Sequence, residues 1–183
     1  MSYNQFNLEY LEKEFEINFQ DLTSLFENIT PVNPSSFLQE LLKENIPLAL
    51  AIHTEKARSE MIVAPILIEM RKIYHHQISL FSGADFNIDP SKGLTGRWDF
   101  LISNSPSQLR ITAPIFTIVE AKNDNIKSGI AQCIAEMIAA QIFNLQQNNH
   151  ISCIYGCVTT GSNWKFMKLV EKTVYIDSME YFI

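Results

Sequence analysis

The chain has 183 residues, of which 46% are hydrophobic and 19% are charged. These fractions are ordinary for a globular protein and exclude a disordered chain, and the length suits one domain with a small extension. Six of the 20 acids and one of the 14 bases lie in residues 1–30, which leaves residues 31–183 close to neutral. The net charge of −6 therefore neither supports nor excludes a nucleic-acid partner.

The first residues and the longest apolar run bear on location. Residues 1–16 carry acids where a secretory signal needs bases followed by an apolar block. The longest apolar run, residues 62–68, is much shorter than a membrane span and contains Pro65. We therefore expect a cytoplasmic protein that does not span a membrane.

Residues 1–48 are predicted to form a helical extension of a main domain that covers residues 49–183. In residues 5–28 the apolar side chains recur at helix-like intervals. A cluster of breakers with two prolines follows, and then a short helical pattern over residues 36–45, with Ser35 or Ser36 as the N-cap.

From residue 53 to residue 74 the apolar side chains again follow a helical period, with Thr54 as a candidate N-cap. Pro65 lies inside this stretch and should kink the helix or divide it. Beyond it, alternating patterns predict strands, and a long helical pattern covers residues 125–147. The predicted strands cover residues 77–83, 84–89, 96–103, 114–122, 152–160, 163–170 and 173–177.

This order of elements predicts an α/β protein with a mixed sheet and helices on its faces. Consecutive strands before the long helix predict antiparallel pairing, and the long helix should return the chain to a parallel neighbour.

The three cysteines are Cys133, Cys153 and Cys157. The last two have roughly the spacing of a zinc-binding pair, but a second pair of ligands is missing nearby. We expect buried free thiols.

A carboxylate and an ammonium stand at the end of the most apolar predicted strand. Glu120 and Lys122 share one face of that strand because side chains alternate with period two. If the strand over 96–103 pairs with it as an antiparallel hairpin, Asp99 lies beside Glu120. Two adjacent carboxylates repel each other unless a cation or proton lies between them. Mg²⁺ prefers oxygen ligands, so these two acids and the main-chain carbonyl of Ala121 would suit it.

This pattern resembles the PD-(D/E)xK nuclease superfamily, also called restriction-endonuclease-like. Asp99 matches the aspartate of the motif and Glu120-Ala121-Lys122 matches its E-x-K, although Trp98 stands where the family name has proline. The family also has a glutamate on the helix before the sheet, for which Glu60 is the first choice and Glu55 the second. The helix after E-x-K often carries a glutamine, here Gln132, with Glu136 one turn later on the same face.

The resemblance implies a restriction-endonuclease-like mixed sheet and hydrolysis of phosphodiester bonds in nucleic acid, with DNA as the expected substrate. Asp99, Glu120, Ala121 and Glu60 would bind Mg²⁺, with Mn²⁺ as a substitute, and Lys122 would position or deprotonate the attacking water. Many such enzymes act as dimers, so a homodimer is one expected assembly.

The sequence leaves two alternatives open. Asn123 and Lys127, at the start of the long helix, would either meet a phosphate or be ordinary polar residues of a helix start. The whole chain would be either a nuclease or a catalytically silent protein-binding or regulatory module that keeps the fold.

Overall fold

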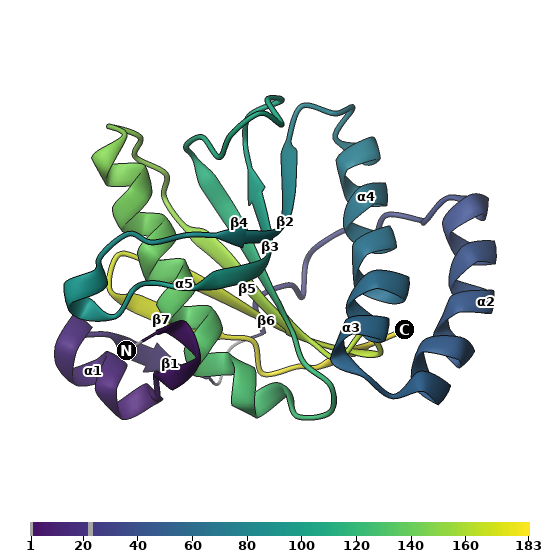
Figure 1. Cartoon of the computed structure of the whole chain (residues 1–183), viewed down its shortest axis with the longest axis horizontal. Coiled ribbons are helices and arrows are strands. Elements are labelled where there is room, and N and C mark those ends of the chain that lie inside the picture. The colour runs from purple at the N-terminus through teal and green to yellow at the C-terminus, as the bar shows by residue number, and fades with distance from the viewer. Residues whose placement is uncertain (1, 22–23) are drawn as a thin grey trace.

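A mixed sheet forms the centre of the computed structural model, which describes residues 2–21 and 24–183 (Figure 1). In these residues the sheet has eight strands in the order β1-β7-β6-β5-β4-β3-β2, and β8 pairs with β6. The strands are β1 (Asn18–Gln20), β2 (Ser79–Asp85), β3 (Arg97–Ser103), β4 (Ile115–Ala121), β5 (Ile154–Thr159), β6 (Asn163–Val170), β7 (Thr173–Ile176) and β8 (Tyr181–Phe182). The predicted α/β class is confirmed.

The pairing directions agree with those expected from the order of the elements. β2, β3 and β4 pair antiparallel in sequence, and the long helix α5 (Ile126–Gln146) then returns the chain to β5, which is parallel to β4. β4 is thus a central strand. Its side chains alternate between two cores, with Ile118 in one and Val119 in the other, which explains why the strand is apolar at both parities.

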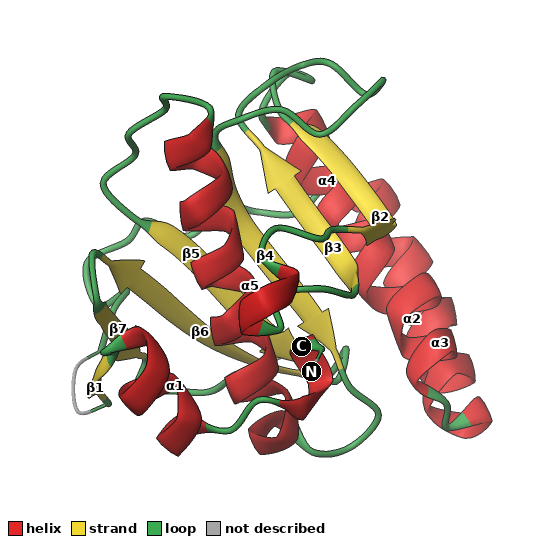
Figure 2. Cartoon of the chain, turned by 60° about the vertical axis from the view of Figure 1, so that its left-hand side comes forward, coloured by secondary structure: helices red, strands yellow, loops and turns green. Residues whose placement is uncertain are grey.

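Helices cover both faces of the sheet (Figure 2). On one face α5 packs with the short helix η1 (Tyr3–Gln5) and α1 (Leu8–Phe15). The other face is covered by α4 (Ala64–Ile73), and α2 (Ser36–Ile52) lies outside it. Within the described part of the chain, no helix is long and apolar enough to cross a membrane.

The N-terminal segment differs from the predicted run of helix over residues 5–28. The helix ends at Phe15, Glu16 takes a left-handed conformation, and β1 then pairs in parallel with β7. The helical spacing up to Phe15 is followed by an alternating pattern in which Ile17 is buried and Asn18 exposed, so two periods were read as one. Residues 22–23, which the predicted helix also covered, lie outside the described residues.

The helices before the sheet agree better with their predicted start signals. Ser35 caps α2, because its Oγ accepts a hydrogen bond from the Leu38 N–H at 3.2 Å, and Thr54 caps α3 (Glu55–Arg58) through the Ala57 N–H at 3.2 Å. However, α2 continues past residue 45 and through Pro47 to Ile52.

Pro65 divides the next helix as predicted. A π-helical turn, η2 (Ser59–Val63), separates α3 from α4, and Pro65 sits in the first turn of α4. Proline has no N–H to bond the Met61 carbonyl one turn earlier, and the side chain of Asn45 donates to that carbonyl instead at 2.9 Å.

The predicted strand over residues 84–89 is wrong beyond Asp85. β2 ends there, and the chain turns through η3 (Pro90–Lys92) back to β3. The alternating pattern arises instead because Phe86 is buried against Trp98, with ring centroids 4.2 Å apart.

Candidate active site

Asp99 and Glu120 meet where the ladder between β3 and β4 ends. Phe100 lies opposite Val119, so the next step brings Asp99 to the level of Glu120. Here the Asp99 side chain takes the place of a main-chain acceptor, because its Oδ2 accepts a hydrogen bond from the Ala121 N–H at 2.8 Å. The predicted antiparallel hairpin is confirmed, and it brings the two acids together at one end of the sheet.

Trp98 occupies the position of the motif's proline for a reason of packing. Its ring is 1% exposed and lies in the core on the α5 side, between Phe86 and Tyr3. The residue before Asp99 therefore anchors the start of β3 in the core.

Lys122 and Glu120 contact each other on the α5 side of the sheet. Lys122 Nζ lies 2.6 Å from Glu120 Oε1, which confirms that the two residues share a face. Glu120 is 2% exposed, and its other oxygen, Oε2, is buried without a hydrogen-bond partner among the described residues. Gly129 of α5 leaves room for the lysine, because a Cβ there would lie 3.1 Å from its Cγ and Cε.

α5 extends this contact into a chain of hydrogen bonds. Lys122 Nζ donates to Gln132 Oε1 at 3.2 Å, and Gln132 Nε2 donates to Glu136 Oε1 at 3.1 Å. Gln132 is thus brought to the site as predicted. Glu136 is fully buried, and its Oε2 also lacks a partner in the part of the chain that the structure describes.

The buried acids have strongly shifted pKa values. Burial, reinforced by the charge of Asp99, raises the pKa of Glu120 to about 8, although the ammonium of Lys122 acts against this rise. Burial and the nearby Glu120 raise the pKa of Glu136 well above its usual range. Burial alone would lower the pKa of Lys122, but attraction to Glu120, Glu55 and Asp99 raises it above its ordinary value. At neutral pH Lys122 therefore keeps its proton, and the glutamates are the groups that titrate.

These shifts predict how stability depends on pH in the absence of divalent ions. In the unfolded chain Glu120 has the ordinary pKa of 4.5, whereas in the folded chain its pKa is about 8. It therefore loses its proton at a lower pH in the unfolded chain. Between these values the folded state holds more protons, so the free energy of unfolding falls as pH rises. Glu136 acts in the same direction, and Lys122 titrates above this window.

Chemical denaturation in EDTA from pH 5 to pH 8 measures this effect. We expect Glu120→Gln to flatten the decline, whereas Glu9→Gln, which changes an exposed glutamate of α1, leaves it unchanged. Identical pH profiles for Glu120→Gln and the wild type would contradict the assignment of the shift to Glu120.

The structure does not bring Glu60, the first choice for the helix glutamate, to this site. Its side chain is 63% exposed and lies 3.8 Å from Lys56. Glu55, the second choice, acts electrostatically on both Glu120 and Lys122. The π-helical turn that contains Glu60 interrupts the 3.6-residue period, so spacing along the sequence did not predict which glutamate acts on the site.

The acids fit a hard divalent ion in part. Among the described residues, no three Cys, His, Asp or Glu side chains are grouped so that they could hold a metal ion. Mg²⁺, however, is commonly bound by one or two carboxylates and several waters. Asp99 and the unpartnered Oε2 of Glu120 supply such a pair, and the carbonyl of Ala121 as a further ligand stays a prediction.

The three cysteines were predicted to be buried free thiols. All three cysteines are free; Cys133 and Cys157 are buried as expected, whereas Cys153 is half-buried.

Lys127 is exposed, and the role predicted for it at the start of α5 is untested.

Arg58, which the sequence did not single out, is a further ionisable residue buried near the end of β4. It is 7% exposed, and its Nη1 donates to the Thr160 carbonyl at 3.0 Å. The preceding carbonyl, that of Thr159, accepts from the Lys122 N–H at 2.8 Å, so Arg58 and Lys122 are attached to neighbouring residues. A buried arginine has no local sequence signal, because its burial depends on which loop packs over it.

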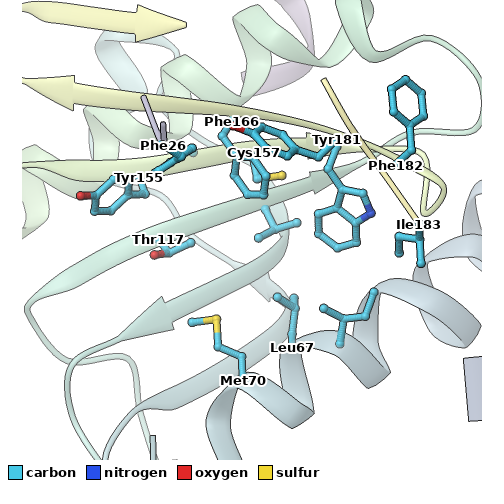
Figure 3. Close-up of a pocket in the computed structure, with 14 residues that line it drawn as sticks. Phe26, Leu67, Met70, Thr117, Tyr155, Cys157, Phe166, Tyr181, Phe182 and Ile183 are labelled. Carbon is cyan, nitrogen blue, oxygen red and sulfur yellow. The ribbon is translucent and has the colours of Figure 1, made fainter. Parts of the chain in front are cut away.

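A separate hollow lies on the other face of the sheet (Figure 3). It has a volume of about 520 Å³ and lies between α4 and strands β4 to β6. The described residues that line it include Leu67, Cys157 and Phe166 but no charged side chain. Although it is a well-formed concavity, it lacks the groups needed for acid–base or metal chemistry, so the charged cluster on the α5 face is the better candidate for an active site.

Comparison with known protein families gives no match, and no curated protein matches the chain. The functional interpretation therefore depends on the geometry described above.

Proposed function

We propose that the chain is a metal-dependent nuclease that hydrolyses phosphodiester bonds of nucleic acid, with DNA as the expected substrate. One observation carries this proposal: Asp99, Glu120 and Lys122 meet at the ends of two adjacent strands, with Glu120 buried and one of its oxygens unpartnered. Burying ionisable groups in this way costs stability, so a site that keeps them is better explained by function than by packing.

Asp99 and Glu120 would hold Mg²⁺ or Mn²⁺ at this site. When bound, such an ion polarises the phosphate and lowers the pKa of a bound water. The number of carboxyl groups supports this assignment, because Asp99, Glu120 and Glu136 interact electrostatically with one another and with the ammonium of Lys122.

Lys122 supplies a fixed positive charge beside the acids. Because its pKa is raised, it does not serve as a base at neutral pH but donates hydrogen bonds and offsets the negative charge that develops on the phosphate. Gln132, held in turn by Glu136, orients the ammonium from the α5 side.

The direct test is an assay with single-stranded and duplex DNA, and with RNA, in Mg²⁺, Mn²⁺ or EDTA. Cleavage that requires the divalent ion supports the proposal. A wild-type protein that cleaves none of these substrates in either ion would contradict it.

The two candidate helix glutamates provide a matched pair for this assay. We expect Glu55→Gln to lower the cleavage rate about tenfold, the lower end of the loss seen when a group around a metal site is changed. Glu60→Gln should stay within about twofold of the wild type, because Glu60 is exposed and faces Lys56. A larger loss for Glu60→Gln than for Glu55→Gln would show that the assignment from the structure is wrong.

The second candidate function is a catalytically silent binding module. The apolar hollow of Figure 3 favours it, because uncharged pockets of this size bind apolar groups. Isothermal titration with Mg²⁺ or Mn²⁺ separates the two candidates: a nuclease loses the metal-binding heat on Glu120→Gln, whereas a pure binding module has no such heat.

A further inference from the structure

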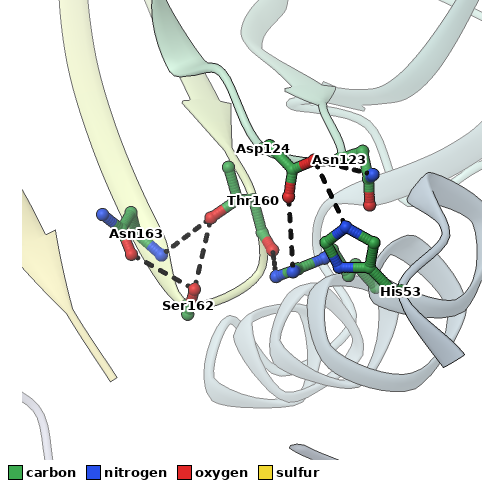
Figure 4. Close-up of polar contacts among 7 residues, drawn as sticks. His53, Asn123, Asp124, Thr160, Ser162 and Asn163 are labelled. Carbon is green, nitrogen blue, oxygen red and sulfur yellow. Dashed lines mark hydrogen bonds and ion pairs between the residues drawn. The ribbon is translucent and has the colours of Figure 1, made fainter. Parts of the chain in front are cut away.

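Two basic side chains converge on a single exposed carboxylate just beyond Lys122 (Figure 4). Asp124 follows Lys122 by two residues, in the loop that leads into α5. Its Oδ2 lies 3.5 Å from His53 Nε2, and its Oδ1 lies 3.7 Å from Arg58 Nη2. His53 and Asp124 are each more than half exposed, so solvent or a ligand can reach this point.

The guanidinium of Arg58 has more donors than the protein satisfies. Arginine presents five N–H groups, and one close hydrogen bond, to Thr160, holds this side chain. Its contact with Asp124 is longer than a hydrogen bond, and its Nε is buried without a partner among the described residues. A buried donor without a partner lowers stability, so this guanidinium is suited to a better acceptor than Asp124 provides.

A phosphodiester supplies the hydrogen-bond acceptors that this guanidinium lacks. It carries one negative charge and two free oxygens, and a guanidinium binds such a group through two parallel hydrogen bonds. The same point lies at the N-terminal end of α5, a helix of 21 residues, where the helix dipole favours an anion.

We propose that Arg58 and His53 form a binding site for a backbone phosphate of nucleic acid, and that the Asp124 carboxylate stands in for this phosphate until the substrate displaces it. This inference rests on the proposed function, because the site would hold a phosphate next to the one that is cleaved. The guanidinium of Arg58 donates to the Thr160 carbonyl, and the main-chain N–H of Lys122 donates to the neighbouring Thr159 carbonyl, so Arg58 lies beside the end of the strand that carries Lys122. Asp124 then acts as a competitor that substrate must replace.

Equilibrium binding tests the proposal without cleavage. The full chain is titrated into fluorescein-labelled single-stranded or duplex DNA in EDTA, and fluorescence anisotropy gives the dissociation constant. Asp124→Asn removes the competing charge while keeping the shape of the side chain. The control, Glu171→Gln, also removes one exposed negative charge but lies at the opposite end of β6 from the Thr160 loop.

We expect Asp124→Asn to bind DNA about threefold or more tightly than Glu171→Gln, the gain expected for removal of one exposed charge contact. In an Arg58→Lys background, which keeps the charge but loses the paired donors, this gain should fall to that of the control. Equal affinities for Asp124→Asn and Glu171→Gln would overturn the proposal.

A second background keeps the test decisive if Arg58→Lys does not fold. His53→Asn removes the other basic side chain, and asparagine tolerates the left-handed conformation that His53 adopts at the end of α2. The gain from Asp124→Asn should shrink in this background too, and an undiminished gain would overturn the role of His53.

The outcomes separate this inference from the proposed function. DNA that is bound according to these expectations but never cleaved in Mg²⁺ or Mn²⁺ contradicts the nuclease and leaves the phosphate site. Metal-dependent cleavage with no special effect of Asp124→Asn leaves the nuclease and removes the phosphate site.

Discussion

Replacement of Lys122 with alanine is expected to lower the rate of metal-dependent DNA cleavage by about 100-fold or more. The ammonium contacts Glu120 directly, and its raised pKa keeps it charged at neutral pH. Its loss removes the charge that offsets the developing negative charge on the phosphate, and it leaves Glu120 Oε1 without its donor. Single-turnover cleavage of labelled DNA measures the change.

Two controls accompany this variant. Lys43→Ala changes an exposed lysine of α2 and should cleave at the wild-type rate. Chemical denaturation shows whether Lys122→Ala is still folded, so that a lost active site is distinguished from a lost fold. A folded Lys122→Ala protein with wild-type activity would refute the catalytic site.

The replacement Leu11→Ala is expected to lower the free energy of unfolding by about 2–5 kcal/mol, the range for deletion of a buried leucine side chain. Leu11 of α1 is fully buried and belongs to the same core as Ile118 of β4 and Ile134 of α5. The acidic N-terminal segment therefore stabilises the helix that holds Gln132 and Glu136.

Leu8 provides the matched control on the same helix. It is 40% exposed, so Leu8→Ala should change the free energy of unfolding by about 0.5 kcal/mol or less. Urea denaturation measures both variants. Equal, small effects would mean that the N-terminal segment is a separable extension, as the sequence suggested for residues 1–48.

Local sequence patterns predicted the strands around the site but did not predict the strand in the N-terminal segment. The strands around the site were predicted within two residues at either end, because each is bounded by turn residues and has a clear period along the chain. Residues 17–20 were assigned to the wrong element, since a three-residue strand is too short to show its own period beside a helix. Its identity depends on β7, which lies more than 150 residues away in the chain.

Within the candidate site, some residues were likewise predicted from local geometry and others were not. Glu120 and Lys122 were paired correctly, because alternation on one strand is local geometry, and Asp99 followed from a hairpin between neighbouring strands. The choice between Glu55 and Glu60 was not local, because Glu60 lies in a π-helical turn that interrupts the helical period after Glu55.

The sequence by itself determined the α/β class, the antiparallel pairing before the long helix and the parallel return after it, and the placement of an acid and a lysine on one face at the end of β4. These features depend on periods of two and 3.6 residues, which adjacent residues establish on their own. Only the tertiary structure decided that Glu136 is buried beneath Gln132, that Arg58 lies beneath the loop that holds Asp124, and that the N-terminal segment shares the core of α5. Each of these depends on which surfaces distant segments bury against one another, and that is set by packing across the whole chain.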